Sequence, residues 1–315
     1  MIKKINENLE KVVKNIEQVI KGKTDVIHQA IIGMLAQGHI LIEDVPGVGK
    51  TMLAHLLAKS IHCSFQRIQF TSDLLPSDIL GVTIYDKEKK AFEFKSGPIF
   101  ANIILADEIN RTTPKTQSAL LEAMNTAQVS IDKKTYTLPQ PFMVIATQNP
   151  IEFHGTFPLP KSQMDRFLMR LRMGYPSLND EVQILREQKV VGDISFVQPV
   201  MEIEDFCEMQ RLTLEVKVDE DLLEYIARIA FATRNNSLIE LGVSTRGVLA
   251  VRRAAQAKAF FENRDYCVPD DIKEMIPSVL AHRIQLAKTF ESTALTRKED
   301  EDALLQVVNE VEVPL

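Results

Sequence analysis

The sequence of 315 residues has few cysteines and lacks a long apolar run. Its three cysteines are scattered without metal-type spacing, which favours reduced packing residues over a disulfide framework or a zinc site. No apolar stretch approaches the ~20 residues that span a bilayer. The N-terminus mixes charge into its apolar positions and lacks the core of a signal peptide. We therefore expect a cytoplasmic protein without a membrane span.

An excess of positive charge and internal repeats are also lacking. The net charge of −6 and the pI near 5.6 argue against a broad nucleic-acid-binding surface. No solenoid-type repeat or low-complexity tract stands out. A hydrophobic content of 45% with 25% charged residues is ordinary for a globular protein, and the length suggests two domains.

The sequence does contain the pattern of a phosphate-binding loop. An apolar run from Ile40 leads into a glycine-containing loop, and Lys50, Thr51 and an apolar helical pattern follow. Glycines let backbone N–H groups face an anion, and the next helix adds its positive N-terminal end. We expect Lys50 at the β- and γ-phosphates of a nucleotide and Thr51 at its Mg²⁺ ion. The expected nucleotide-binding residues are Asp44, Val45, Pro46, Gly47, Val48, Gly49, Lys50, Thr51 and Met52.

Asp44 stands where the usual phosphate-loop pattern has glycine. A carboxylate near phosphates is repulsive unless its side chain turns back to accept hydrogen bonds from the loop backbone, as aspartate readily does. The alternative interpretation of the whole stretch is an ordinary turn between a strand and a helix.

Polar residues follow two further apolar runs. Asp107 and Glu108 end the run from Ile99, and Asn149 follows the run that starts at Phe142. The carboxyl ends of buried parallel strands are where open α/β sheets place their ligands. We expect Asp107 to hold Mg²⁺, Glu108 to act as general base and Asn149 to contact the γ-phosphate or the attacking water. Taken singly, each could simply cap a helix or form a turn.

The rest of the chain falls into two parts. Residues 1–37 have a helical pattern that breaks at Gly22, and residues 83–94 and 129–138 each have the pattern of a β-hairpin. From Asp180 onward the pattern is helical, without a further buried-strand signal. Helices are expected to start near Asp180, Glu202, Asp219, Ser244 and Pro269.

Arg246 lies in the first turn of one of these helices, which Ser244 or Thr245 is expected to cap. The helix dipole disfavours a cation at that end, so an arginine there is a candidate for reaching a phosphate. A solvent-facing arginine that costs only tenths of a kcal/mol remains the alternative.

An ordered series of motifs resembles the MoxR-type ATPases of the AAA+ superfamily over nearly the whole chain. The matching stretches are 41–51, 74–79, 97–100, 106–111, 146–150, 159–167, 244–246 and 279–284. The resemblance implies a P-loop NTPase αβα sandwich with a parallel central sheet in residues 1–176, followed by a small all-α lid domain in residues 177–315. It places ATP between core and lid and between neighbouring subunits of a ring, usually a hexamer.

The resemblance also implies individual roles. Lys50 and Thr51 match Walker A, Asp107 and Glu108 match Walker B, Asn149 matches sensor 1 and Arg246 matches sensor 2. Arg166 is the best match to the arginine finger that acts on the neighbouring subunit's ATP, with Arg111 and Arg170 as rivals. Such a finger is worth ~10³–10⁵ in rate in related phosphoryl transfer. The two hairpins match insertions toward the ring's central face and are candidates for partner contacts.

The resemblance points to an Mg²⁺-dependent ATPase that remodels or matures protein complexes in a chaperone-like manner, with a von Willebrand factor A domain protein as partner. The alternatives are a motor subunit of a magnesium-chelatase-like complex and a nucleotide-gated switch or scaffold with little turnover. An ATPase acting on nucleic acid is disfavoured by the acidic charge balance.

Overall fold

The computed structural model describes residues 2–150, 155–187, 194–287 and 297–314. Its centre is a five-stranded parallel sheet in the order β2-β5-β8-β1-β9. The strands are β1 (Ile40–Glu43), β2 (Phe65–Gln69), β5 (Ile103–Asp107), β8 (Met143–Gln148) and β9 (Met169–Leu171). Because all five strands run in one direction, their carboxyl ends meet at one edge of the sheet and their amino ends at the other.

Both faces of the sheet are covered, which explains the continuous apolar runs. In β1, Ile40 and Ile42 pack into the core cluster formed with α1 (Ile2–Glu17), α2 (Thr24–Leu35) and α3 (Lys50–Ser60). Leu41 points to the opposite face and packs into the second cluster, formed with α4 (Pro76–Leu80) and α5 (Pro114–Thr126). The predicted αβα sandwich is therefore confirmed.

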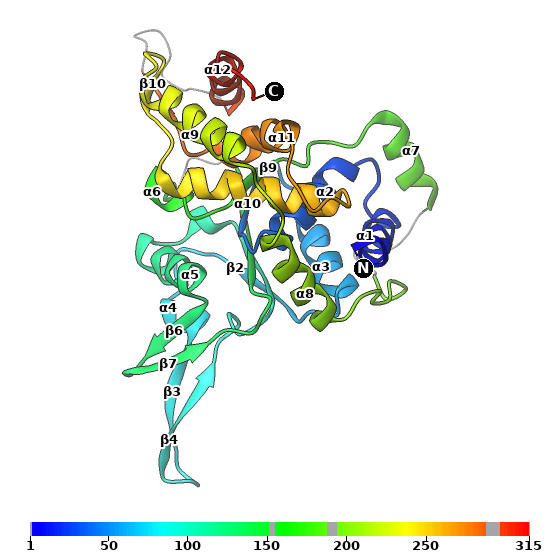
Figure 1. The fold of residues 1–315 in the computed structure, drawn as a ribbon. Helices are drawn as coiled ribbons and strands as arrows, with labels where there is room; N and C mark the ends of the chain where they lie inside the picture. Colours follow the sequence, from blue (N-terminus) through cyan, green and yellow to red (C-terminus); the bar gives the residue numbers. More distant parts are fainter. Residues whose placement is uncertain (1, 151–154, 188–193, 288–296, 315) are drawn as a thin grey trace.

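Two β-hairpins project from the core at the end away from the lid (Figure 1). The first pairs β3 (Gly81–Asp86) with β4 (Ala91–Ser96), and the second pairs β6 (Gln128–Ile131) with β7 (Lys134–Thr137). The rings of Phe94 and Tyr136 stack across them with centroids 4.3 Å apart, and Phe100 packs edge-on against Phe94 at 5.7 Å. These aromatic contacts join the two hairpins to each other.

The C-terminal part is helical, as expected, with one addition. Its helices are α7 (Leu178–Glu187), α8 (Ile203–Leu214), α9 (Glu220–Arg234), α10 (Thr245–Phe261), α11 (Pro269–Leu280) and α12 (Arg297–Asn309). A short antiparallel ladder of β10 (Ile239–Leu241) and β11 (Gln285–Leu286) also occurs, and strands this short leave no buried-strand pattern in the sequence. The lid shares one apolar cluster with the core. Gln210 Nε2 adds a polar link by donating to the carbonyl of Met34 at 2.6 Å.

One predicted strand begins later than its apolar run. The run from Ile99 predicted a strand from that residue, but β5 starts at Ile103. The N–H of Ile99 donates instead to the carbonyl of Ile79 at 3.2 Å, and the N–H of Phe100 closes a turn onto Gly97 at 3.2 Å. A Cβ atom on Gly97 would lie 2.2 Å from the carbonyl oxygen of Ile79, so this close approach requires glycine.

Candidate active site at the carboxyl edge of the sheet

The phosphate loop and the acidic pair lie at the same edge of the sheet. Asp44 follows β1, Asp107 ends β5 and Asn149 follows β8, and these three strands are adjacent. The structure therefore brings together three motifs that are separated by 40 residues or more in the sequence. A short 3-10 helix, η1 (Ile109–Arg111), carries the chain away from the acidic pair.

The phosphate loop has the backbone form that the glycines predict. Gly47 and Gly49 have φ angles of 85° and 94°, in the left-handed region, and Gly49 caps α3. Nζ of Lys50 donates to the carbonyls of Asp44 at 2.6 Å and Val45 at 3.2 Å. Burial lowers the pKa of Lys50, while the charges of Asp44, Asp107 and Glu108 oppose that shift. The ammonium group therefore lies within the electrostatic influence of Asp107, at the end of β5, and of Glu108, which follows it.

Asp44 makes the backbone hydrogen bonds that were required of it. The side chain is almost fully buried, and its Oδ1 accepts from the N–H of Val45 at 2.8 Å. Its Oδ2 accepts from the N–H of Gly174 at 2.6 Å. Asp44 therefore stabilises the loop and fixes the segment after β9 against it.

Asp107 is held by two side chains in this conformation. Its Oδ1 accepts from Oγ1 of Thr147 at 2.6 Å. Its Oδ2 accepts from Nη2 of Arg67 at 2.6 Å and from Nε at 3.1 Å. The sequence does not indicate this role of Arg67, because a single arginine in an edge strand, 40 residues upstream, carries no local signal of this pairing.

Glu108 has a strained backbone and two polar partners. Its φ of 58° lies in the left-handed region, which costs a non-glycine residue about 1–3 kcal/mol and is common at functional sites. Its N–H donates to Oγ1 of Thr147 at 2.8 Å. Its Oε2 accepts from Nε2 of Gln69 at 3.0 Å and pairs with Nε of Arg111 at 3.0 Å. Thr147 therefore contacts both members of the acidic pair.

The donor set fits a magnesium–nucleotide complex. Among the described residues, no group of three or more His, Cys, Asp or Glu side chains could hold a metal alone. Thr51 and Asp107 offer hard oxygen donors beside the phosphate loop, and Mg²⁺ typically combines one or two such donors with water and nucleotide phosphates. Among all the residues that the structure describes, no helix has the length and apolar character needed to span a bilayer.

Arg111 and Arg170, the alternative candidates for the arginine finger, lie toward the carboxyl edge of the sheet. Arg111 pairs with Glu108 of its own chain, as described above. Arg170 is 4% exposed in β9 and pairs with Oε2 of Glu43 at 3.3 Å. Asn149 is buried at the end of β8, where the sequence placed it.

Arg166 and Arg246 lie at the opposite edge of the sheet. They line a cavity of about 600 Å³, whose wall includes residues just before β1, β8 and β9, namely His39, Phe142 and Leu168. The four residues of β1 alone separate the two edges by ~13 Å at ~3.3 Å per residue. The structure therefore does not bring Arg246 or Arg166 to the phosphate loop of its own chain.

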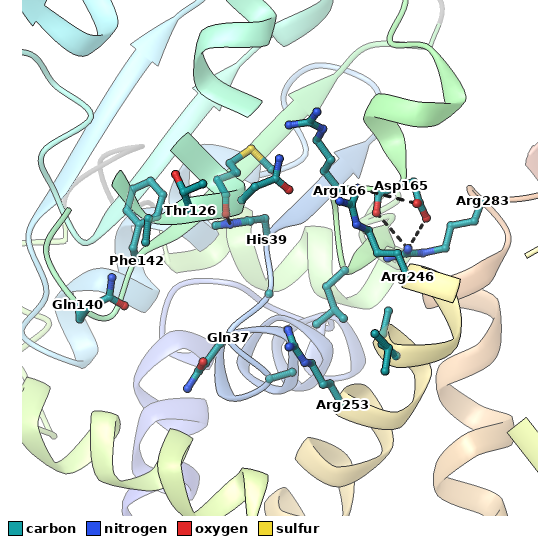
Figure 2. Close-up of a pocket in the computed structure, with 18 residues that line it drawn as sticks. Gln37, His39, Thr126, Gln140, Phe142, Asp165, Arg166, Arg246, Arg253 and Arg283 are labelled. Atoms are coloured by element: carbon teal, nitrogen blue, oxygen red, sulfur yellow. Dashed lines mark hydrogen bonds and ion pairs between the residues drawn. The ribbon is translucent and has the colours of Figure 1, made fainter. Parts of the chain in front are cut away.

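One carboxylate organises this arginine-rich cavity (Figure 2). Asp165 accepts a short hydrogen bond from Nη1 of Arg283, and its Oδ2 lies 4.0 Å from Nη1 of Arg246. Oγ of Ser244 donates to the same carboxylate at 3.0 Å and accepts from the N–H of Gly247 at 3.1 Å. Ser244, rather than Thr245, is therefore the cap of α10.

His39 forms an uncharged part of the cavity wall. Its Nδ1 accepts from the N–H of Val144 at 3.0 Å, so Nε2 donates to the carbonyl of Met124 at 2.9 Å. Burial lowers the pKa of His39 to about 4. The positive charge of the cavity therefore comes from its arginines, including Arg253 on α10.

Comparison with known proteins gives a consistent picture. Residues 39–169 match the ATPase family associated with various cellular activities (AAA), and residues 231–306 match the AAA lid domain. The chain is 39% identical to Chaperone MoxR1 of Mycobacterium tuberculosis, over 91% of this chain and 77% of that protein. It is 51% identical to YeaC of Bacillus subtilis, an uncharacterized protein, over 88% of this chain and 87% of that one.

A solved structure and a more distant relative extend the comparison. The crystal structure of a Cytophaga hutchinsonii protein assigned as an ATPase has a TM-score of 0.89 and 39% identity, covering 100% of this chain and 97% of that one. A magnesium-chelatase subunit ChlI homolog of Methanocaldococcus jannaschii is 27% identical over 66% of this chain and 56% of that protein.

Proposed function

The chain belongs to the MoxR-type ATPases of the AAA+ superfamily and hydrolyses ATP, and from this premise we propose that it is an Mg²⁺-dependent motor, active in the cytoplasm, that remodels protein complexes as a ring. The observation that carries the proposal is the division of the machinery between two edges of one sheet. The phosphate loop and acidic pair lie at the carboxyl edge, and Arg166 and Arg246 lie at the amino edge.

At the carboxyl edge, the site residues exchange their present hydrogen-bond partners for the nucleotide and its Mg²⁺ ion. Lys50 exchanges its two loop carbonyls for phosphate oxygens, since an anion offers the ammonium group a stronger partner. Thr51 and Asp107 would hold Mg²⁺, which would supply positive charge to offset that of the nucleotide phosphates. Asp107 must first release Arg67.

Glu108 activates the attacking water once it leaves its own partners. Its carboxylate is now engaged by Gln69 and Arg111. Release of these contacts lets Glu108 accept a proton from water, while Asn149 orients that water or the γ-phosphate. Turnover therefore depends on a rearrangement around Glu108 as well as on nucleotide binding.

The arginines at the amino edge serve a neighbouring copy. Arg166 and Arg246 are too far from their own phosphate loop, whereas phosphoryl transfer gains about 10³–10⁵ in rate from an arginine finger. A face that binds phosphate groups and meets a different face with arginines makes a head-to-tail interface, and such an interface forms a ring when the rotation between successive copies closes. We infer a homo-oligomeric ring, with six subunits as the expected number. Arg111 and Arg170 fit the finger role less well, because each pairs with a carboxylate of its own chain.

A mixing experiment tests this arrangement. Lys50→Ala and Arg166→Ala protomers should each be inactive alone. Mixed rings should recover part of the ATPase activity, at interfaces that join an intact phosphate loop to an intact Arg166. Absence of recovery in rings shown to be mixed would contradict a role for Arg166 in trans.

The client-binding element that we propose is the pair of hairpins. Tyr85 and Phe92 are 53% and 76% exposed near the tip of the first hairpin and contact each other edge-on at 5.3 Å. Large exposed aromatic side chains typically mark protein contacts. A pull-down with Glu108→Gln in ATP should retain the client and a von Willebrand factor A domain partner. Loss of both when Phe92→Ser is added would assign the contact to the hairpin.

A motor subunit of a magnesium-chelatase-like complex is the second candidate, favoured by the similarity to the ChlI homolog. The identity and coverage are lower than for the MoxR relatives, so we prefer the remodelling function. Proteins captured by the stalled ring distinguish the two. A nucleotide-gated switch with little turnover would bind ATP but show no steady phosphate release.

A further inference from the structure

We propose that Asp165 is a positioning residue that holds Arg166 of the core and Arg246 of the lid in one arrangement, ready for a phosphate group of a neighbouring copy. This inference rests on the proposed function at the amino edge. Asp165 itself touches no nucleotide in this scheme and acts through the two arginines. Its contacts with the core and the lid carry the argument.

The first set of contacts fixes the backbone on both sides of Arg166. Arg283, from the lid, donates from Nη1 to the carbonyl of Asp165 at 3.0 Å and from Nη2 to the carbonyl of Phe167 at 2.7 Å. The same guanidinium is paired with the Asp165 carboxylate. Arg283 thus clamps the two residues that flank Arg166, and Asp165 holds the clamp in place.

The second set of contacts fixes the start of α10. The Asp165 carboxylate accepts from the hydroxyl of Ser244, which caps the helix. Arg246 follows two residues later, in the first turn. Its guanidinium lies 4.0 Å from Asp165, the longest of these contacts, and its side chain is 52% exposed. Arg246 is therefore oriented by Asp165 but free to exchange that partner for a phosphate.

Charge and burial explain why the carboxylate cannot simply be replaced. The Arg283 side chain is 2% exposed, and burial lowers its pKa while Asp165 opposes the shift. Without the carboxylate, a buried guanidinium loses its counter-charge, which is strongly unfavourable and displaces the clamp. The Arg166 side chain itself makes few polar contacts that could fix its position. Its Nη1 donates to the carbonyl of Leu121 at 2.8 Å, and its buried Nε has no hydrogen-bond partner among the described residues.

The test is the steady-state ATPase activity of Asp165→Asn. Its kcat should fall by roughly 10²-fold, as expected when a catalytic group is displaced by about 1 Å. KM for ATP should stay within about twofold of the unmodified protein's value. The phosphate loop lies at the other edge, and its contacts stabilise bound ATP and the transition state equally. In mixed rings with Lys50→Ala, activity should recover, since the Lys50→Ala protomer still presents an intact arginine face.

Lys161→Ala is the matched control. Lys161 also links this segment to the lid: it lies in α6 (Lys161–Met164), donates to the carbonyl of Ile284 at 2.7 Å and lies 4.0 Å from Asp300. This variant should keep its kcat, and an equal loss in it would overturn the proposal by making lid attachment the cause. Asp165→Glu, which retains the charge, should recover part of the rate lost in Asp165→Asn.

The remaining outcomes separate this inference from the function on which it rests. Unchanged kcat in Asp165→Asn would overturn it. The inference would also be overturned if Asp165→Asn mixed with Lys50→Ala stays inactive while Arg166→Ala mixed with Lys50→Ala recovers activity. If neither mixture recovers, the trans site and this inference both fail. Should Asp165→Asn not fold, Ser244→Ala removes the link between Asp165 and α10 together with the cap of that helix, and it should lower kcat at constant KM; a normal kcat there would be equally decisive against the proposal.

Discussion

Replacement of Asp44 by asparagine should destabilise the nucleotide-free protein by about 2–4 kcal/mol. The carboxylate now accepts from two backbone N–H groups, those of Val45 and Gly174, in a buried site. Asparagine has one acceptor oxygen, so one of these N–H groups would face an amide NH₂ and remain unsatisfied. An orphaned buried donor costs about 1–3 kcal/mol, and the remaining hydrogen bond, now to a neutral instead of a charged oxygen, is weaker by about 1 kcal/mol.

Thermal unfolding without nucleotide measures this effect. At about 2–4 °C per kcal/mol, the midpoint should fall by roughly 4–16 °C. Asp205→Asn on the exposed face of α8 is the matched control, and it should shift the midpoint by less than about 2 °C, as surface changes usually cost under ~0.5 kcal/mol. If Asp44→Asn also leaves the midpoint unchanged, the two hydrogen bonds do not stabilise the loop and the reasoning is refuted.

Three further predictions concern catalysis, metal binding and pH. Glu108→Gln should bind ATP normally while its turnover falls by about 10²-fold or more, because a general base is lost; near-normal phosphate release would contradict that role. Arg67→Ala should lower the Mg²⁺ concentration for half-maximal turnover by up to about fivefold, since a half-exposed ion pair with Asp107 is worth at most ~1 kcal/mol; an equal or higher requirement would show that Arg67 does not compete with the ion. His39 has its pKa lowered to about 4 in the folded protein, below its ordinary value of 6.5, so the unfolded chain takes up a proton first as the pH falls. Stability should therefore decrease by about 3 kcal/mol between about pH 6.5 and pH 4 and then level off. Urea unfolding across this range should show a smaller decrease in His39→Gln, and parallel profiles would exclude His39 as the cause.

The sequence predicted the carboxyl edge of the sheet well, for a physical reason. Asp44, Asp107 and Asn149 each lie directly at the end of an apolar run, and parallel strands necessarily bring such ends together. Each signal is local in the sequence, and the sheet supplies the proximity. The backbone role of Asp44 followed from the chemistry of its short side chain.

The amino edge was much less accessible to sequence reasoning. The helix-dipole argument singled out Arg246, but the edge of the sheet that α10 approaches depends on how the lid docks, which no local pattern encodes. Asp165 meets Arg283 across 118 residues, and Arg67 meets Asp107 across 40. The assignment of Arg246 to the same site as the phosphate loop therefore had no support from spacing, and the structure separates the two.

The aromatic contact between the hairpins has a mechanical consequence. Because Phe94 and Tyr136 stack, β3–β4 and β6–β7 form one stiff arm whose base adjoins α5, the helix that follows Glu108 and η1. Six residues of β4 at ~3.3 Å each give this arm a length of ~20 Å. A rotation of about 10° at the base would then move the tip by ~3–4 Å over that lever length. Such a displacement of the tip would equal about one residue of an extended polypeptide.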